Sequence, residues 1–508
     1  MNEWEAMQAL SSDESGTDKT LRSEAWFRRI LIIFAMVAVL GILGHFILLL
    51  WAQNGFTGGE AVVAAHAMML VHDGTLYYDL NHYPYTVAPY TPLFYLIDAG
   101  VQQLGLPAYT AGRLISFLAL LGIFVLSWYI VLLYTRDLYS ASMSALLCAS
   151  SALLVLWGTV GQVDVLAVFW AMTAFYLYSR YAILGESTLI WAAVCAVLAF
   201  FTKQTMLACP AAICLLLWFT NRKAAVQFGC GCLAVVLIVA VSLNTVLEGR
   251  FLADTVRANL NPFSVKKLLQ HLQFAALTAG PLAIVAVFGA RKAIRKCGGA
   301  PFVYLGLAAL AFLATAPKIG SDLNYQLEFT ILLVLCASLS LYATDFFRLS
   351  FVRSKTSITL LQLPLGVFLV VNYCTTGSVL LMRYVSEQQT RTEVAALQSS
   401  LADGGRVLSA DYNASVRLRG RLDVEMAFYH LLVDAGVVDP KPLQRDLAAS
   451  AFSTVLLLED VRNHEAPLDI EISSLPATQL DEIRRRYTMV KHVSGPALNG
   501  VYVYKPRQ

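Results

Sequence analysis

The sequence predicts a polytopic α-helical membrane protein of about eleven transmembrane helices, followed by a small extracytoplasmic α/β domain. Hydrophobic residues make up 57% of the 508 residues, charged residues make up only 14%, and the mean hydropathy is +0.61. Long apolar segments also recur until about residue 380, where the composition changes. These features are typical of a chain that crosses a bilayer many times.

The transmembrane spans follow from apolar runs long enough to cross a bilayer core. We expect them at residues 30–52, 112–134, 139–157, 163–180, 187–202, 204–220, 223–246, 271–290, 301–316, 326–344 and 357–379, so that residues 30–384 form one transmembrane module. Residues 1–29 are polar and mixed in charge, without the basic start and apolar core of a cleavable signal peptide. We expect them to form a cytosolic tail.

The orientation follows from basic residues in short loops, which stay on the cytosolic side. Arg136, Arg222 and the run from Arg291 to Lys296 fall in alternate loops. The loops 53–111 and 247–270 are then external, and an odd number of spans places the C-terminus outside as well. We therefore expect a multi-pass protein, most simply in the inner (plasma) membrane of a bacterium.

Residues 385–508 are expected to form the extracytoplasmic domain. Short strands are predicted at 407–410, 454–459 and 501–504, with helices at 423–435 and 478–486. The small net charge of +3 does not indicate nucleic-acid binding. The nine cysteines lie nearly all inside apolar segments, which favours helix packing over a disulfide framework or a zinc site.

The first external loop carries the most unusual composition of the chain. Glu60 follows the first span closely, and Asp73 and Asp79 lie further along the loop. Six tyrosines, among them Tyr83 and Tyr85, occur within nineteen residues, interleaved with proline. They indicate either an aromatic belt at the membrane interface or stacking on sugar rings. The second external loop, 247–270, mixes apolar and basic residues and forms either interfacial helices or an ordinary connector.

Further polar residues recur at the external ends of the predicted spans. They are Arg113, Gln162, Asp164, Lys203, Asn324, Tyr325 and Glu328. Because charge at membrane depth is costly, each is a functional candidate. Structural roles compete with this interpretation: Asp164 suits a helix N-terminus, Lys203 could reach the interface, and Arg113 could be an interfacial anchor. Lys203 has no acidic neighbour in the sequence, which favours an anionic ligand.

Together these stretches resemble the GT-C class of integral-membrane glycosyltransferases, which includes protein mannosyltransferases and lipid A aminoarabinose transferases. The resemblance rests on the order and common sidedness of Gly59-Glu60-Ala61, Gly74-Thr-Leu-Tyr-Tyr-Asp79, Pro92-Leu-Phe-Tyr95, Arg113, Gly161-Gln-Val-Asp164, Lys203 and Asn324-Tyr-Gln-Leu-Glu328. The chain departs from the pattern at one place, because many relatives carry an Asp-Glu pair where this sequence reads Gly59-Glu60.

The resemblance implies transfer of a sugar, with inversion, from a polyprenyl-phosphate donor to a glycan, lipid or protein acceptor. A lipid phosphate leaves well without an acid, so one carboxylate base and cations for the phosphate are sufficient. On this basis Glu60 is the expected general base, with Asp73 or Asp79 as a second acid. Lys203 and Arg113 are the expected phosphate ligands, with Lys266 and Lys267 as weaker ones. The residues expected to line the substrate cavity are Gln162, Asp164, Asn324, Tyr325, Glu328, Tyr83 and Tyr85.

Other readings remain open from the sequence. No cofactor is expected, although a divalent metal held by members of the set Glu60, His72, Asp73, Asp79 and His82 is an alternative without tight ligand spacing to support it. A transporter or flippase of lipid-linked sugars is a second alternative. An inactive relative that serves as an assembly subunit is a third.

Overall fold

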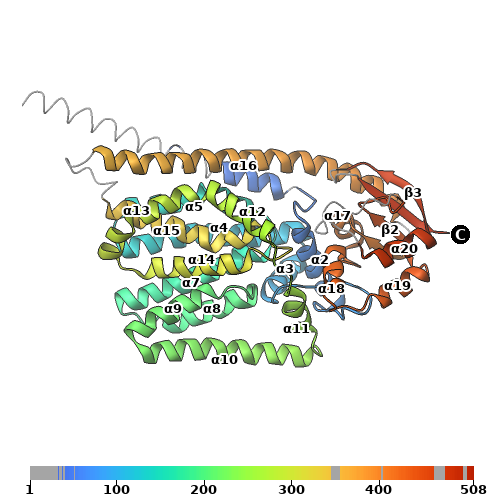
Figure 1. The fold of residues 1–508 in the computed structure, drawn as a ribbon, viewed down its shortest axis with the longest axis horizontal. Helices are drawn as coiled ribbons and strands as arrows, with labels where there is room; N and C mark the ends of the chain where they lie inside the picture. Colours follow the sequence, from blue (N-terminus) through green and yellow to red (C-terminus); the bar gives the residue numbers. More distant parts are fainter. Residues whose placement is uncertain are drawn as a thin grey trace, which may run out of the picture.

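The computed structural model describes residues 40–50, 52–344, 355–401, 404–462, 475–495 and 500–507, together with Ile33 and Val37. The expected tail 1–29 and most of the first half of the expected span 30–52 lie outside the described residues. A helical bundle fills one end of the molecule and a small sheet domain the other, and one long helix runs beside both (Figure 1).

The bundle is built around one nearly fully buried helix. Helix α15 (Leu327–Ala343) buries almost all of its side chains, whereas α10 (Arg222–Val246) buries only Ala224, Ala225 and Phe228 and lies at the edge of the bundle (Figure 1). The other bundle helices are α4 (Ala108–Thr135), α5 (Leu138–Ala149), α6 (Ala152–Gly158), α7 (Val163–Leu184), α8 (Leu189–Thr202), α9 (Ala208–Thr220), α13 (Gly280–Cys297) and α14 (Ala300–Thr315). Exposed leucine, isoleucine and valine side chains on α10 suit contact with lipid.

Within the described residues, four helices are long and apolar enough to cross a membrane, and two bent pairs would raise the number to six. Further apolar helices are shorter, so the expected count of about eleven spans is not confirmed. The apolar helices together with the fold comparisons below make this a multi-pass membrane protein.

Two of the expected spans contain a sharp bend. The span expected at 139–157 is bent by 64° between α5 and α6, and the one expected at 271–290 is bent by 70° between α12 (Val265–Thr278) and α13. Pro281 lies in the first turn of α13 and has no N–H to continue the preceding helix. The Asn372 side chain forms a hydrogen bond with the backbone at each bend. It accepts from the Ala152 N–H at one bend and donates to the Thr278 carbonyl at the other, each at 2.8 Å.

The last expected span, 357–379, lies within a much longer helix. Helix α16 (Lys355–Leu397) is 43 residues long and runs without a break from the bundle to the sheet (Figure 1). It therefore crosses residue 385, where the sequence had suggested a domain boundary. Its length couples the apolar bundle to the C-terminal domain through one rigid element.

The C-terminal residues form a four-stranded sheet with the order β1-β2-β4-β3. Strands β1 (Arg406–Ser409) and β2 (Phe452–Leu457) are parallel, whereas β4 (Val501–Pro506) is antiparallel to both β2 and β3 (Tyr487–Val493). Its helices are α17 (Tyr412–Ala414), α18 (Met426–Asp434), α19 (Lys441–Ala448) and α20 (Ala477–Arg486), with a π-helical turn over Ser415–Arg419. The sheet confirms the expected α/β character. Strand β3 was not expected, because it is an edge strand that exposes most of its residues.

The two loops that are expected to be external join the bundle to the sheet domain. The first loop contains α2 (Gly58–Asp73) and α3 (Leu93–Gln103), and the second contains α11 (Arg250–Thr255), a 3-10 turn over Arg257–Asn259 and the start of α12. Leu80, Tyr85 and Val87 of the first loop share a buried apolar cluster with the sheet domain. The first loop is therefore part of that domain's core.

Candidate functional site

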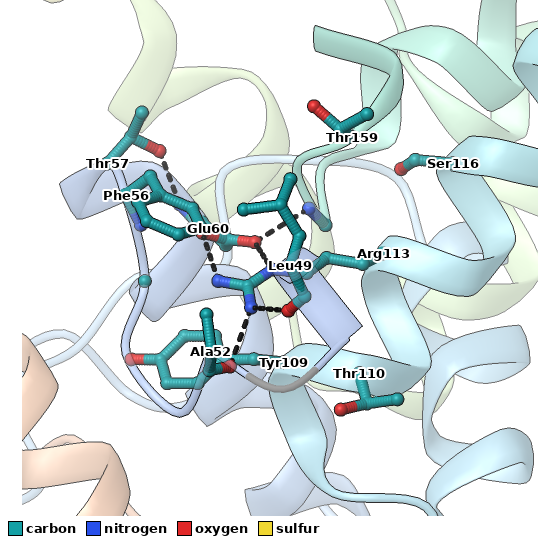
Figure 2. Close-up of polar contacts among 12 residues, drawn as sticks. Leu49, Ala52, Phe56, Thr57, Glu60, Tyr109, Thr110, Arg113, Ser116 and Thr159 are labelled. Atoms are coloured by element: carbon teal, nitrogen blue, oxygen red, sulfur yellow. Dashed lines mark hydrogen bonds and ion pairs between the residues drawn. The ribbon is translucent and has the colours of Figure 1, made fainter. Parts of the chain in front are cut away.

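The first polar cluster is a buried ion pair between Glu60 and Arg113 (Figure 2). Glu60 belongs to the first turn of α2, and Arg113 belongs to the first turns of α4. The Arg113 Nε atom donates to Glu60 Oε1 at 2.8 Å, and a terminal nitrogen donates to Oε2 at 3.2 Å. Neither residue is exposed to solvent.

Arg113 uses all of its hydrogen-bond donors within the protein. A guanidinium has five N–H groups. Two bind Glu60, and the other three donate to the carbonyls of Leu49, Ala52 and Asn54 at 2.6 to 2.9 Å (Figure 2). Arg113 therefore holds the end of the apolar helix Leu40–Leu50, and the residues that follow it, against α4. In this arrangement it has no N–H left to bind the donor phosphate, which is the role that was expected for Arg113.

The Glu60 carboxylate is also occupied on both oxygens. Besides Arg113, Oε2 accepts from the Phe56 N–H at 2.7 Å and Oε1 accepts from the Gly161 N–H at 2.9 Å. Thr57 caps α2 by accepting from the Glu60 N–H at 3.0 Å, so the pair follows the Thr-x-x-Glu capping pattern. Four N–H donors therefore occupy the two oxygens of the Glu60 carboxylate. Its expected role as general base stays a prediction.

A four-residue turn links this ion pair to a second one. The turn begins at Gly161, whose N–H binds Glu60, and continues through Gln162, whose amide donates to the Thr57 hydroxyl at 2.8 Å. Gly161 lies very close to the backbone of Gly112. A Cβ atom added to either glycine would be only 3.0 to 3.1 Å from the backbone of the other. The turn ends at Asp164, in the first turn of α7. Glycine at both positions allows this approach.

The second cluster is centred on Lys203, in the turn after α8. Its ammonium donates to Asp164 Oδ1 at 2.5 Å, and the other carboxylate oxygen accepts from the Asn324 amide at 3.0 Å. The same ammonium lies 4.1 Å from the centroid of the Tyr325 ring and 5.9 Å from that of Tyr90. Lys203 thus has an acidic partner, Asp164, on another helix. This partner could not be recognised in the sequence, where Lys203 has no acidic neighbour.

Lys203 differs from Arg113 because it still has N–H donors that no protein group accepts in the described structure. An ammonium has three N–H donors, and a single hydrogen bond, to Asp164, is formed among the described residues. Lys318, in the loop after α14, is a further cation near this cluster: burial and the charge of Lys203 both lower the pKa of its ammonium. The Lys318 ammonium makes one hydrogen bond in the described structure, to the Asn259 carbonyl at 3.4 Å. Glu328 is buried beside this cluster and accepts from the Tyr304 hydroxyl at 2.6 Å.

Other residues expected at the site lie elsewhere. Asp73 ends α2, thirteen residues after Glu60, which corresponds to about 20 Å along the helix. It bonds to Tyr78, and Asp79 bonds to His82, both at exposed positions. Lys266 and Lys267 lie in the first turn of α12. The described residues contain no group of three His, Cys, Asp or Glu side chains arranged to hold a metal ion.

Tyr83 and Tyr85 point into the C-terminal domain. The Tyr83 hydroxyl donates to Asp423 at 2.6 Å, and the Tyr85 hydroxyl donates to Asp446 at 3.0 Å. Arg406 lies over the Tyr83 ring at 4.2 Å from its centroid. These two tyrosines therefore dock the first loop onto the sheet domain and do not join Glu60 or Lys203.

The sequence interpretation missed two buried carboxylates near the second cluster. Asp254 lies on α11, and Glu425 immediately precedes α18. Each has one buried oxygen without a hydrogen-bond partner among the described residues. Acidic residues in polar loops look solvated in a sequence, and only the apolar neighbours Phe251, Leu252 and Ala253 could have indicated that Asp254 is buried.

The fold and these clusters define a multi-pass membrane protein with buried ion pairs gathered at the end of its bundle that faces the sheet domain. No protein-family model matches the sequence, and no curated protein does so either. Solved structures do match. The chain is similar to ArnT from Cupriavidus metallidurans bound to undecaprenyl phosphate, with a TM-score of 0.62 and 12% identity over 92% of this chain and 97% of that one.

A second similar structure is the oligosaccharyltransferase AglB from Archaeoglobus fulgidus, in complex with an inhibitory peptide and a dolichol-phosphate. Its TM-score is 0.51 at 13% identity, over 95% of this chain and 74% of AglB. ArnT, a lipid A aminoarabinose transferase, and AglB are both GT-C glycosyltransferases. The chain therefore has the GT-C fold, as its sequence resemblance predicts.

Proposed function

We propose that this protein transfers a sugar from a polyprenyl-phosphate-linked donor to an acceptor on the external side of the membrane, with inversion at the anomeric carbon. The observation that carries the proposal is the pair of neighbouring ammonium groups of Lys203 and Lys318. They repel each other, and in the described structure only Lys203 bonds to a carboxylate. An anion that binds between them relieves this repulsion, and a phosphate supplies acceptor oxygens for both.

The fold supports a lipid phosphate over a soluble one. ArnT binds undecaprenyl phosphate, and AglB is in complex with a dolichol-phosphate. Both are glycosyltransferases, so a transporter or flippase is not favoured. Here the same two lysines would hold the donor phosphate and stabilise the charge that it gains as it leaves.

The expected orientation also supports this placement. Helix α10 begins at Arg222 and Lys223 and ends next to α11, at the end of the bundle near the C-terminal domain (Figure 1). If the basic end of α10 faces the cytosol, both polar clusters and the sheet domain lie outside. A donor with its lipid tail in the membrane and its sugar outside would then meet an external acceptor, which is a glycan, a lipid or a protein.

The test is to measure binding and turnover on the same purified protein. Undecaprenyl phosphate should bind the wild type, and Lys318→Ala should weaken that binding about tenfold, the effect of about 1.4 kcal/mol. Lys292→Ala, on α13 in the basic run at its cytosolic end, is the matched control and should bind as the wild type does. Turnover is the release of undecaprenyl phosphate by the purified protein from synthetic undecaprenyl-phosphate-linked pentoses and hexoses. Membranes of the cells that naturally make the protein, from a strain that lacks it, are added as the source of acceptor.

The outcomes separate the functions. Binding with release supports a glycosyltransferase. Binding without release from any of these donors would identify the chain as an inactive relative that serves as a subunit. A wild type that does not bind the carrier would overturn the proposed function altogether.

A further inference from the structure

The segment from Tyr85 to Tyr90 connects the C-terminal domain to the Lys203 cluster. At its start, the Tyr85 carbonyl accepts from the Glu425 N–H at 3.2 Å. Further along, the Ala88 N–H donates to Asp254 Oδ2 at 3.0 Å. At its end, the Tyr90 ring lies 5.9 Å from the Lys203 ammonium. One short segment thus brings two carboxyl groups, from α11 and from the sheet domain, next to the predicted phosphate site.

Three buried polar atoms near this segment have no hydrogen-bond partner among the described residues. They are Asp254 Oδ1, Glu425 Oε2 and the hydroxyl oxygen of Tyr95. Asp254 and Tyr95 are completely buried, and Glu425 is 7% exposed. An unpaired buried polar atom costs about 1–3 kcal/mol, so a ligand that pairs with all three would be bound favourably.

The electrostatics show that the three groups share one environment. Burial raises the pKa of Asp254 well above its usual range, and the charge of Glu425 raises it further. Burial likewise raises the pKa of the Tyr95 hydroxyl, with added contributions from Glu425 and Asp254. The pKa of Tyr90 is raised by burial and then by Asp164, Tyr325 and Glu425. Tyr90 therefore interacts both with the Lys203 cluster and with Glu425.

We propose that Glu425 is the general base of the sugar transfer and that Asp254 and Tyr95 bind the hydroxyl or amine of the acceptor beside it. This inference rests on the proposed function. Glu425 takes the base role because its side chain makes no hydrogen bond in the described structure, whereas one oxygen of Asp254 is held by Ala88. Both oxygens of Glu60, in contrast, are occupied by Arg113 and backbone N–H groups.

The proposed step balances for an acceptor hydroxyl. The hydroxyl gives its proton to Glu425 Oε2 while its oxygen forms a bond to the anomeric carbon of the donor sugar. The bond between the anomeric carbon and the phosphate oxygen breaks, and the phosphate leaves with the bonding electron pair as the polyprenyl phosphate. Asp254, whose pKa burial raises well above its usual range, orients the acceptor through its unpaired oxygen.

The experiment compares Glu425→Gln with the wild type in two assays. Undecaprenyl phosphate binding should be unchanged, whereas release of undecaprenyl phosphate from the undecaprenyl-phosphate-linked sugars should fall about 10²- to 10⁴-fold. Glu459→Gln is the matched control, because Glu459 is another carboxyl of the same domain with a buried unpaired oxygen. Its release rate should stay within a few-fold of the wild type.

A second variant protects the test against misfolding. Asp254→Asn keeps an acceptor for the Ala88 N–H and should raise the concentration of acceptor-bearing membranes needed for half-maximal release, with carrier binding unchanged. Release by Glu425→Gln within a few-fold of wild type would overturn the base assignment and leave the proposed function intact. A wild type that neither binds the carrier nor releases it would overturn both proposals.

Discussion

The Glu60 carboxylate and the Arg113 guanidinium form a fully buried ion pair through two hydrogen bonds of 2.8 and 3.2 Å. They lie 53 positions apart in the sequence, on two helices that begin at the end of the bundle facing the sheet domain. The pair also fixes three carbonyls at the end of the first helix and the N–H of Gly161. The first loop, α4 and the turn before α7 are thus tied together at one point.

The main effect of Glu60→Gln should be to destabilise the fold, and not to remove a catalytic base. Removing one partner of a buried pair leaves the other charge without compensation, and such changes cost about 3–5 kcal/mol. We expect a clearly lower unfolding midpoint in detergent. Glu186→Gln, which removes a half-exposed partner of Arg180, is the control and should cost about 1 kcal/mol or less. A variant with wild-type stability and a release rate about 10²-fold or more below wild type would instead establish Glu60 as the base.

Lys203 and Asp164 should behave as one unit in a double-mutant cycle. Lys203→Met leaves a buried carboxylate unpaired, and Asp164→Asn leaves a buried ammonium with a weaker partner. Each single variant should lower the unfolding midpoint. The double variant should be less destabilised than the sum of the two, by about 1–3 kcal/mol. Strict additivity would show that the 2.5 Å contact contributes no coupling to the fold.

Asn372 should be critical for the bends in the bundle. It is fully buried, and its amide pairs the Ala152 N–H at one break and the Thr278 carbonyl at the other. Asn372→Leu would leave both backbone groups unpaired at about 1–3 kcal/mol each, a loss of about 2–6 kcal/mol in all. The unfolding midpoint checks this. Asn244→Leu removes a solvent-exposed bond to the Leu252 N–H and should change the midpoint little.

The residues of both ion pairs could be predicted as a set, but their pairing could not. Charge at the ends of apolar helices marks a functional or structural position, and this selected Glu60, Arg113, Asp164 and Lys203 individually. Which carboxylate meets which cation depends on how α4, α7 and α8 pack. Apolar composition does not specify that packing, because the helices are similarly hydrophobic on all sides.

The two bends in the bundle and the buried carboxyl groups of Asp254 and Glu425 could not be predicted, for different reasons. Hydropathy measures the length of an apolar run and not its direction, so Ser150-Ser151 and Gly280-Pro281 passed as parts of straight spans. Asp254 lies in the mixed apolar and basic loop 247–270 and Glu425 in the expected helix 423–435, so neither stands at the end of an apolar span. They are buried because the first loop, the second loop and the sheet domain pack on one another, which is a contact between segments more than 150 residues apart.

The pH dependence of turnover should report Glu425. Burial raises the pKa of this carboxyl to about 8, and a general base must be ionised to accept a proton. Below pH 8 the release of carrier should therefore rise about tenfold per pH unit and then level off. The pKa values of Tyr90, Tyr95 and Asp254 are each raised by burial and further by Glu425. The two tyrosines titrate above pH 10 and do not produce a limb below pH 8, and the Asp254→Asn variant should keep the limb if Glu425 is the titrating group.

Stability should change in the opposite direction over the same range. Because the folded pKa of about 8 exceeds the ordinary value of 4.5, the folded state binds more protons between these two values, and stability falls as the pH rises from 4.5 to 8. Glu425→Gln removes this contribution, so its unfolding midpoint should fall less than that of the wild type. Its residual release rate should also lose the tenfold dependence on pH. A variant that keeps the wild-type profile in both measurements would place the titrating group, and the base, on another residue.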